Sequence, residues 1–245
     1  MVSAESTAKQ LEADVRFLAS EVGERNPIHF ESLQRARVWI VQSLSNSIGA
    51  PREQTYRIAG REVANIIEVK PGTDPGLGSI VIGAHYDSCR GTPGADDNAS
   101  AVAVMLELAR RFSKDQTRHS LEFVGFTLEE PPYFRSDDMG SMRLAKEWRD
   151  AGKKIDLMIC LEMLGFFTDE KIQEFPLPGM GFIYPNEGNF IAAIGHTGSP
   201  EPVARFCDLL KKNATLPVVS FSGPKMLTGI DFSDHQSFWK YNYPA

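Results

Sequence analysis

A histidine and an aspartate stand two residues apart, directly after a short apolar run. The run is SIVIGA at residues 79–84, and the polar pair is His85 and Asp87. Imidazole is one of the commonest zinc ligands in proteins. A carboxylate two residues further on can accept the other ring N–H of that histidine and fix its tautomer. The pair is therefore typical of a metal-bound histidine supported by an aspartate.

Two pairs of adjacent carboxylates follow along the chain. Asp96 and Asp97 lie in GADDNAS directly before a predicted helix, and Glu129 and Glu130 follow the apolar run 121–127. An N-cap would explain one aspartate of the first pair but not both. Adjacent carboxylates repel each other, so the first pair indicates a nearby cation or bound protons. In the second pair, one glutamate could bind metal while the other accepts a proton.

Two further candidate ligands lie in the second half of the sequence. Glu162 follows the apolar run 155–161, and His235 lies in SDHQSFW near the end. Two histidines and three carboxylates suit two zinc ions, with one histidine on each ion and a carboxylate between them. Glu129 is left over for acid–base chemistry. The candidate ligands are His85, Asp97, Glu130, Glu162 and His235.

These polar residues are expected at the ends of strands in an α/β fold. Apolar and β-branched runs predict strands at 63–69, 79–84, 121–127, 155–161, 190–194 and 216–221. Helical spacing predicts two helices on either side of Pro27, and further helices at 98–112, 142–151 and 201–212. Alternating strands and helices favour a three-layer α/β/α sandwich with a mixed, mostly parallel twisted sheet and helices on both faces.

Two expectations about the connections are less regular. The segments near 55–69 and 79–84 are predicted to form an antiparallel pair at one edge of the sheet. The segment 172–189 holds three prolines and three glycines and is predicted to be a long loop. Ligands of open α/β sheets bind at the carboxyl ends of the strands, where the candidate residues are expected.

Composition excludes several classes of protein. The chain has 245 residues, of which 42% are hydrophobic and 24% are charged, so it is neither disordered nor low in complexity. A formal charge of −6 without a basic cluster argues against nucleic-acid binding, and no apolar stretch is long enough for a membrane span. Three widely spaced cysteines do not predict a disulfide framework or a thiolate zinc site. The N-terminus lacks the pattern of a signal peptide, which favours the cytoplasm.

Five motifs in order resemble those of one enzyme family. HYDS, GADDNAS, LEEPP, an acidic residue after a strand and SDHQSFW resemble the motifs of the co-catalytic di-zinc aminopeptidases of metallopeptidase family 28. Relatives of this family include glutamate carboxypeptidase II and the glutaminyl cyclases. The resemblance covers roughly residues 60–245. It implies a zinc-exopeptidase-like fold, two zinc ions per chain and a peptide or aminoacyl substrate, while it leaves the oligomeric state open. Relatives are often exported, so the resemblance leaves the localisation undecided.

The resemblance assigns metal-binding roles to particular residues. His85 would bind one zinc ion and His235 the other, and Asp97 would bridge the two. Glu130 would bind one of the ions. Glu162 stands where the family commonly has aspartate, and its extra methylene can still reach a metal if the main chain lies further back.

The resemblance also implies the reaction and its catalytic residues. Glu129 would be the general base that activates a water shared by two zinc ions, and Asp87 would support His85. The enzyme would then be an exopeptidase that hydrolyses N-terminal peptide bonds. Met226 and Ile230, with Tyr184 in the long loop, are candidates for a pocket that receives the substrate side chain.

Three alternatives stay open at this point. The first is a mono-zinc acyltransferase similar to glutaminyl cyclases, although those relatives lack the histidine that stands here as His85. The second is a non-catalytic binding module of the same fold, although receptor-type relatives lose the ligands and the base that this sequence keeps. The third is a metal-dependent hydrolase of another amide, and carboxypeptidase activity is equally open. Relatives continue past residues 243–245, so we expect residues 1–245 to be a single catalytic domain without the family's C-terminal strand and helix.

Overall fold

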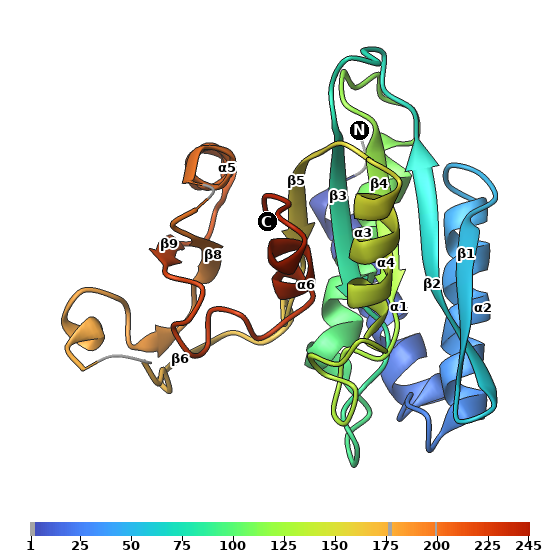
Figure 1. Cartoon of the computed structure of the whole chain (residues 1–245). Coiled ribbons are helices and arrows are strands. Elements are labelled where there is room, and N and C mark those ends of the chain that lie inside the picture. Colours follow the sequence, from blue (N-terminus) through green and yellow to red (C-terminus); the bar gives the residue numbers. More distant parts are fainter. Residues whose placement is uncertain (1–2, 176–177, 199) are drawn as a thin grey trace. The chain divides into compact units, whose positions relative to one another are not determined.

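The computed structural model describes residues 3–175, 178–198 and 200–245, which fall into two units (Figure 1). The first unit extends to Gly165 and resumes over Ser233–Tyr243. The second unit comprises Phe166–Phe232 with Pro244–Ala245. The expectation that residues 1–245 act as one catalytic domain stays a prediction.

Within its described residues, the first unit is built on a five-stranded mixed sheet. Its strands are β1 (Arg52–Ile58), β2 (Arg61–Lys70), β3 (Ser79–His85), β4 (Leu121–Phe126) and β5 (Ile155–Cys160). Their order across the sheet is β1-β2-β4-β3-β5. β3 runs parallel to both β4 and β5, whereas β2 runs antiparallel to β1 and β4. The carboxyl ends of β3, β4 and β5 therefore meet at one edge.

The antiparallel part of the sheet corrects one prediction. β1 and β2 form a hairpin around Ala59 and Gly60, whose φ angles of 48° and 80° match a tight primed turn. The hairpin thus closes within the segment before residue 70. The expected antiparallel pairing of 79–84 was wrong: β3 lies between β4 and β5 because its buried run suits an inner parallel strand.

Helices cover both faces of this sheet, which confirms the predicted layered α/β architecture. They are α1 (Ala4–Arg16), α2 (Phe30–Ser45), α3 (Ala101–Phe112), α4 (Gly140–Asp150) and α6 (His235–Lys240). α2 contacts β2 and α3 contacts β3 and β4, while α4 contacts β2 and α6 contacts β5. Alternation along β4 separates the two faces, since Phe123 joins the core beneath α2 and α3 whereas Phe126 contacts Phe238 of α6. None of the helices described here is long and apolar enough to cross a membrane.

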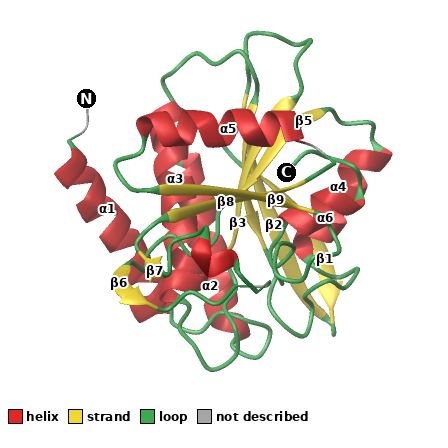
Figure 2. Ribbon diagram, turned by 90° about the vertical axis from the view of Figure 1, so that its left-hand side faces the viewer, coloured by secondary structure: helices red, strands yellow, loops and turns green. Residues whose placement is uncertain are grey.

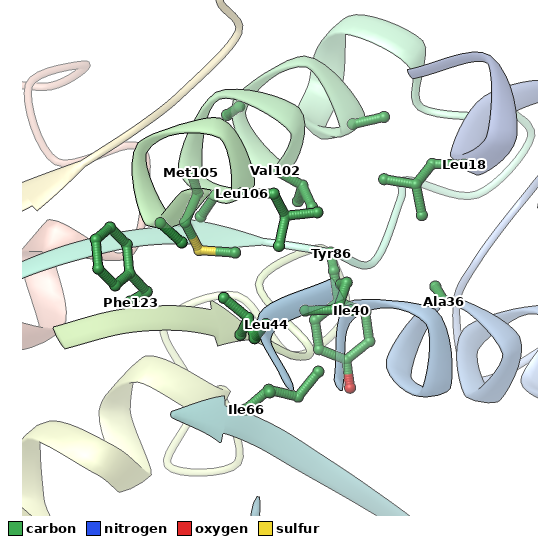
Figure 3. Close-up of a cluster of buried hydrophobic side chains, with 14 of the residues drawn as sticks. Leu18, Ala36, Ile40, Leu44, Ile66, Tyr86, Val102, Met105, Leu106 and Phe123 are labelled. Atoms are coloured by element: carbon green, nitrogen blue, oxygen red, sulfur yellow. The ribbon is translucent and has the colours of Figure 1, made fainter. Parts of the chain in front are cut away.

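A dense apolar core supports the strand ends from one side (Figure 3). Helical spacing places side chains one turn apart on α2 and α3, facing the sheet. Burying such side chains stabilises the fold by roughly 1.5–3 kcal/mol each. Fully or almost fully buried members are Ile40, Leu44, Ile66, Val102, Met105, Leu106 and Phe123.

The second unit contains a short strand–helix–strand motif. β8 (Ile191–His196) and β9 (Val218–Gly223) run parallel, and α5 (Pro200–Asn213) lies alongside both (Figure 2). These elements confirm the two strands and the helix predicted for this region. The predicted loop 172–189 is irregular apart from a short helix at Met180–Phe182 and β7 (Glu187–Gly188), which pairs with β6 (Thr168–Lys171). Residues 176 and 177 of this loop lie outside the described residues.

A buried glutamate in β2 yields a testable prediction about stability. Glu68 is 6% exposed and its Oε2 atom has no hydrogen-bond partner among the described residues. Burial raises the pKa of Glu68, and the main-chain amide of Val69 opposes that rise. A carboxyl whose pKa is raised by folding binds its proton more tightly in the folded state, so stability falls as the pH rises through that pKa. The Glu68→Gln variant should therefore be more stable than the wild type at neutral pH, by about 1 kcal/mol.

Thermal unfolding followed from neutral pH down toward the ordinary carboxyl pKa of 4.5 checks this. The advantage of the variant should shrink over that range. Glu122→Gln is the matched control, because buried Glu122 of β4 pairs with Lys153 at 2.6 Å and its loss should destabilise the chain. Equal stability of Glu68→Gln and wild type at neutral pH would contradict the prediction.

Candidate metal centre

Three strands deliver acidic residues and a histidine to one edge of the first unit. His85 is the last residue of β3, Glu129 and Glu130 follow β4, and Glu162 follows β5. The register aligns His85 with Phe126 of β4, so the loops after these strands start at the same level. The sequence pattern predicted that these polar residues would lie together at the carboxyl ends of the strands.

Three of the predicted ligands form a compact group. His85, Asp97 and Glu130 each offer one ligand atom, and these atoms lie within 4.8 Å of one another. Asp97 Oδ1 lies 3.1 Å from Nε2 of His85. Asp97 Oδ1 and Glu130 Oε1 are buried, and neither atom has a hydrogen bond of suitable distance and angles among the described residues. Buried carboxylate oxygens without partners are costly, so this donor set fits a divalent cation.

Asp87 supports two sides of this group at once. Its carboxylate accepts hydrogen bonds from the main-chain amides of Glu129 (3.2 Å) and Glu130 (3.1 Å). The Nδ1 atom of His85 lies 3.2 Å from the main-chain oxygen of Asp87 and 3.5 Å from its carboxylate. A proton on Nδ1 would leave the lone pair of Nε2 facing the acidic group, as a metal ligand requires. The sequence predicted the link to His85 but had no signal for the amides that follow β4.

Glu129 is buried beside the group without being part of it. Its side chain lies 3.8 Å from Nε2 of His85 and the residue is 6% exposed. Burial raises the pKa of Glu129 to about 9; the charge of His85 opposes the rise, while nearby carboxylates such as Asp234 add to it. Burial likewise raises the pKa of Glu130 to about 7, with Asp97 adding to the rise. Burial thus disfavours the ionised form of both glutamates, and a bound cation would favour it.

Glu162 is held by hydrogen bonds from two other segments. Its Oε2 atom accepts from Ser233 Oγ at 2.6 Å and from Asn98 Nδ2 at 3.2 Å. The same oxygen lies 3.5 Å from Nε2 of His85. Glu162 is thus next to the compact group, and the longer side chain that replaces the usual aspartate still reaches it. Its coordination of a metal stays a prediction.

His235 is not brought into the compact group of the described residues. It begins α6, and its ring lies 4.5 Å from that of Trp239, centre to centre. Its role as the second histidine ligand stays a prediction. The preceding residue, Asp234, is fully buried and neither of its carboxylate oxygens has a hydrogen-bond partner among the described residues. Sequence reasoning missed Asp234, whose one signal was its place next to the histidine.

The three predicted pocket residues all lie in the second unit. Met226 is 89% exposed, whereas Ile230 is buried. Tyr184 is half-buried, and its ring contacts those of Phe175 and Phe221. Their role in substrate binding stays a prediction.

Comparison with known proteins decides the family. The profile of Peptidase family M28 matches residues 65–245. The chain belongs to peptidase family M28. This membership confirms the resemblance that the five motifs carried.

Relatives of this M28 chain include enzymes and a protein of unassigned activity. The Escherichia coli (strain K12) protein named "Uncharacterized protein YfbL" is 36% identical over 249 residues, which cover 98% of this chain and 76% of that protein. A protein of Arthroderma otae named "Probable leucine aminopeptidase" is 26% identical over 195 residues, which cover 74% of this chain and 45% of that protein. The chain therefore spans less than half of this named relative.

Solved structures share the M28 fold at low sequence identity. Porphyromonas gingivalis glutaminyl cyclase superposes with a TM-score of 0.66 at 21% identity, covering 98% of this chain and 80% of that one. LapB from Legionella pneumophila superposes with a TM-score of 0.68 at 18% identity, covering 100% of this chain and 60% of that one. These likenesses confirm the fold class predicted from the sequence.

The position of Asp87 predicts that it controls metal affinity. In the Asp87→Asn variant, an amide NH₂ would face one of the two main-chain N–H groups that the carboxylate now accepts. Zinc affinity, measured by competition with a chelator, should fall about 10–100-fold. Asp156→Asn is a matched control, because Asp156 similarly accepts from the amide of Gly78 and lies 3.5 Å from His119, near the start of β5. Wild-type affinity in Asp87→Asn, or an equal loss in the control, would contradict the assignment.

Proposed function

We propose that this chain is a zinc-dependent exopeptidase that hydrolyses N-terminal peptide bonds, with Glu129 as the general base. The observation that carries the proposal is the compact group of His85, Asp97 and Glu130 beside a buried glutamate. One oxygen of each of its two carboxylates is buried without a hydrogen-bond partner among the described residues. Membership of family M28 supports peptidase chemistry. The relatives named as leucine aminopeptidases support the choice of the N-terminal bond.

The chain's residues would hold the metal as follows. His85, Asp97 and Glu130 are the ligands that the compact group supplies. The proposal extends to a second ion, bound by His235 with Glu162 as a further candidate and Asp97 shared. Zinc, when bound, acidifies a water molecule and polarises the carbonyl of the scissile bond.

Glu129 would move the proton. It is enclosed, it lies beside the imidazole that would bind metal, and the main chain at its amide is fixed by Asp87. Its carboxylate would take a proton from the attacking water and donate it to the leaving amine. The pKa of Glu129 is high because the site is buried and acidic, and a bound cation would favour its ionised form.

The charge of the site favours a substrate with a free amino group. Asp97, Glu129, Glu130 and Asp234 are all carboxylates of the same unit, and a neutral, metal-bound His85 would not offset their charge. An ammonium group would be attracted by the carboxylates that the metal leaves unneutralised. This supports an aminopeptidase over a carboxypeptidase, whose substrate brings another negative charge.

A mono-zinc acyltransferase is the second candidate. The shared fold with Porphyromonas gingivalis glutaminyl cyclase supports it. On the family resemblance described above, such cyclases lack the histidine equivalent to His85, so its presence argues against this candidate.

One assay separates these functions. The zinc-loaded chain is incubated with leucine arylamide and, separately, with a peptide that has N-terminal glutamine. Release of arylamine that stops on adding a chelator is the expected result. Cyclisation of the glutamine with loss of ammonia would instead establish the acyltransferase. Absence of both reactions in the zinc-bound chain would contradict the proposal and leave the non-catalytic binding module, a carboxypeptidase or a hydrolase of another amide.

The Glu129→Gln variant tests the general base. Glutamine keeps the shape of the side chain but cannot take the proton from water, so kcat should fall about 10²–10⁴-fold. Zinc content and KM should stay close to wild type, since Glu129 is not a proposed ligand. Glu130→Gln provides the contrast, because it should lose zinc as well as turnover. Full activity of Glu129→Gln would refute the assignment.

A further inference from the structure

A completely buried arginine lies next to the segment that connects two proposed ligands. Arg25 precedes α2, in the connection after the helical turn at Phe17–Val22, and its exposed fraction is 0%. The segment that it contacts runs from the end of β3 to Asp97, so it begins at His85. The function proposed above gives Arg25 no role.

Each nitrogen of the Arg25 guanidinium donates to main-chain carbonyls. Nε donates to Tyr86 (2.9 Å), and Nη2 donates to Gly94 (3.0 Å). Nη1 donates to Pro93 (2.6 Å) and also to two carbonyls of the N-terminal segment, at Leu18 and Gly23. The acceptors at Tyr86, Pro93 and Gly94 lie at both ends of the connecting segment. The planar guanidinium thus links both ends of this loop to the N-terminal segment at Leu18 and Gly23.

Main-chain contacts of Arg25 strengthen this junction. Its amide donates to Ser88 Oγ at 3.0 Å, and its carbonyl accepts from the amide of Ser88 at 2.8 Å. The Ser88 hydroxyl in turn donates to the carbonyl of Thr92 at 3.1 Å. At Gly94, φ is 60°, and a Cβ atom would lie 2.5 Å from the carbonyl oxygen of Asp97 and 3.0 Å from Nη2 of Arg25. The glycine therefore allows the guanidinium to approach the main chain that carries Asp97.

The charge of Arg25 acts on the same residues. Among the described residues, its hydrogen bonds go to neutral carbonyls rather than to a carboxylate. Burial lowers the pKa of Arg25 to about 10, and the negative charges of Asp87 and Asp97 oppose that shift. The buried cation is thus stabilised by the residues that support or form the metal group.

We propose that Arg25 is a positioning residue of the metal centre, an inference that rests on the function proposed above. Its guanidinium clamps both ends of the segment between His85 and Asp97, and so keeps these two ligands at the spacing that one metal ion needs. Arg25 itself contacts neither the metal nor the substrate.

The Arg25→Lys variant in the full chain tests this role. Lysine keeps the charge, but its single nitrogen cannot reach carbonyls spread around a planar fork. Zinc affinity, measured by competition with a chelator, should fall about 10–100-fold. In the metal-free chain, main-chain amides of residues 86–97 should exchange hydrogen faster than in the wild type. This second readout does not depend on any bound metal.

Arg37→Lys is the matched control. Arg37 is a largely buried arginine of α2 that pairs with Glu53 and has no hydrogen bond to residues 86–97 in the described structure. It should lower the melting temperature and leave both zinc affinity and exchange over residues 86–97 unchanged. The positioning role is overturned if Arg25→Lys lowers the melting temperature but keeps zinc affinity within twofold of the wild type.

A milder variant covers the case in which Arg25→Lys does not fold. Ser88→Ala removes the hydroxyl that links Arg25 to Thr92 and leaves the guanidinium in place, so a severalfold loss of zinc affinity and faster exchange are expected. Unchanged affinity and exchange in Ser88→Ala would then overturn the proposal. A folded wild type that binds no zinc would contradict the proposed function instead, and the exchange of residues 86–97 would still decide whether Arg25 clamps them.

Discussion

The crowding of carboxylates, most of them buried, around one imidazole is the constraint on which the rest of this structure depends. Asp97, Glu129, Glu130 and Asp234 lie in the same unit as His85, and several of their oxygens are enclosed without a hydrogen bond among the described residues. Such an arrangement is unfavourable unless protons or a cation offset the charge. Without a metal, burial raises the pKa values of Glu129 and Glu130, which means that their ionised forms are disfavoured. A bound divalent cation would offset this cost, and the same residues would then form its binding site.

The fold has to hold these residues in place against their mutual repulsion. Parallel pairing of β3 with β4 and β5 brings the strand ends to one level, and apolar side chains fill the space between the sheet and its helices. Asp87 then ties the main chain after β4 to His85, while Arg25 ties the loop after β3 to the helical layer. The hydrogen bonds that fix this edge go mainly to the main chain, so the side chains of the proposed ligands stay available for a metal.

The sequence predicted the part of the site that local patterns encode. An apolar run followed by a polar residue locates His85, Glu130 and Glu162 at strand ends, because parallel strands end at a common edge. The partners of β3 were not predicted, because an apolar run indicates an inner strand without specifying its neighbours, and the hairpin closed earlier in the chain. Arg25 was missed because its acceptors lie more than sixty residues away as well as nearby, and no spacing rule reports such contacts. The motif that contains His235 was recognised, yet the described cluster holds only one histidine.

The most direct test of the central claim is an anomalous-difference map at the zinc absorption edge, from crystals of the zinc-loaded chain. The account predicts a peak about 2.0–2.2 Å from Nε2 of His85 and from one carboxylate oxygen each of Asp97 and Glu130. A well-ordered chain grown with excess zinc and without a peak among these three residues would contradict it.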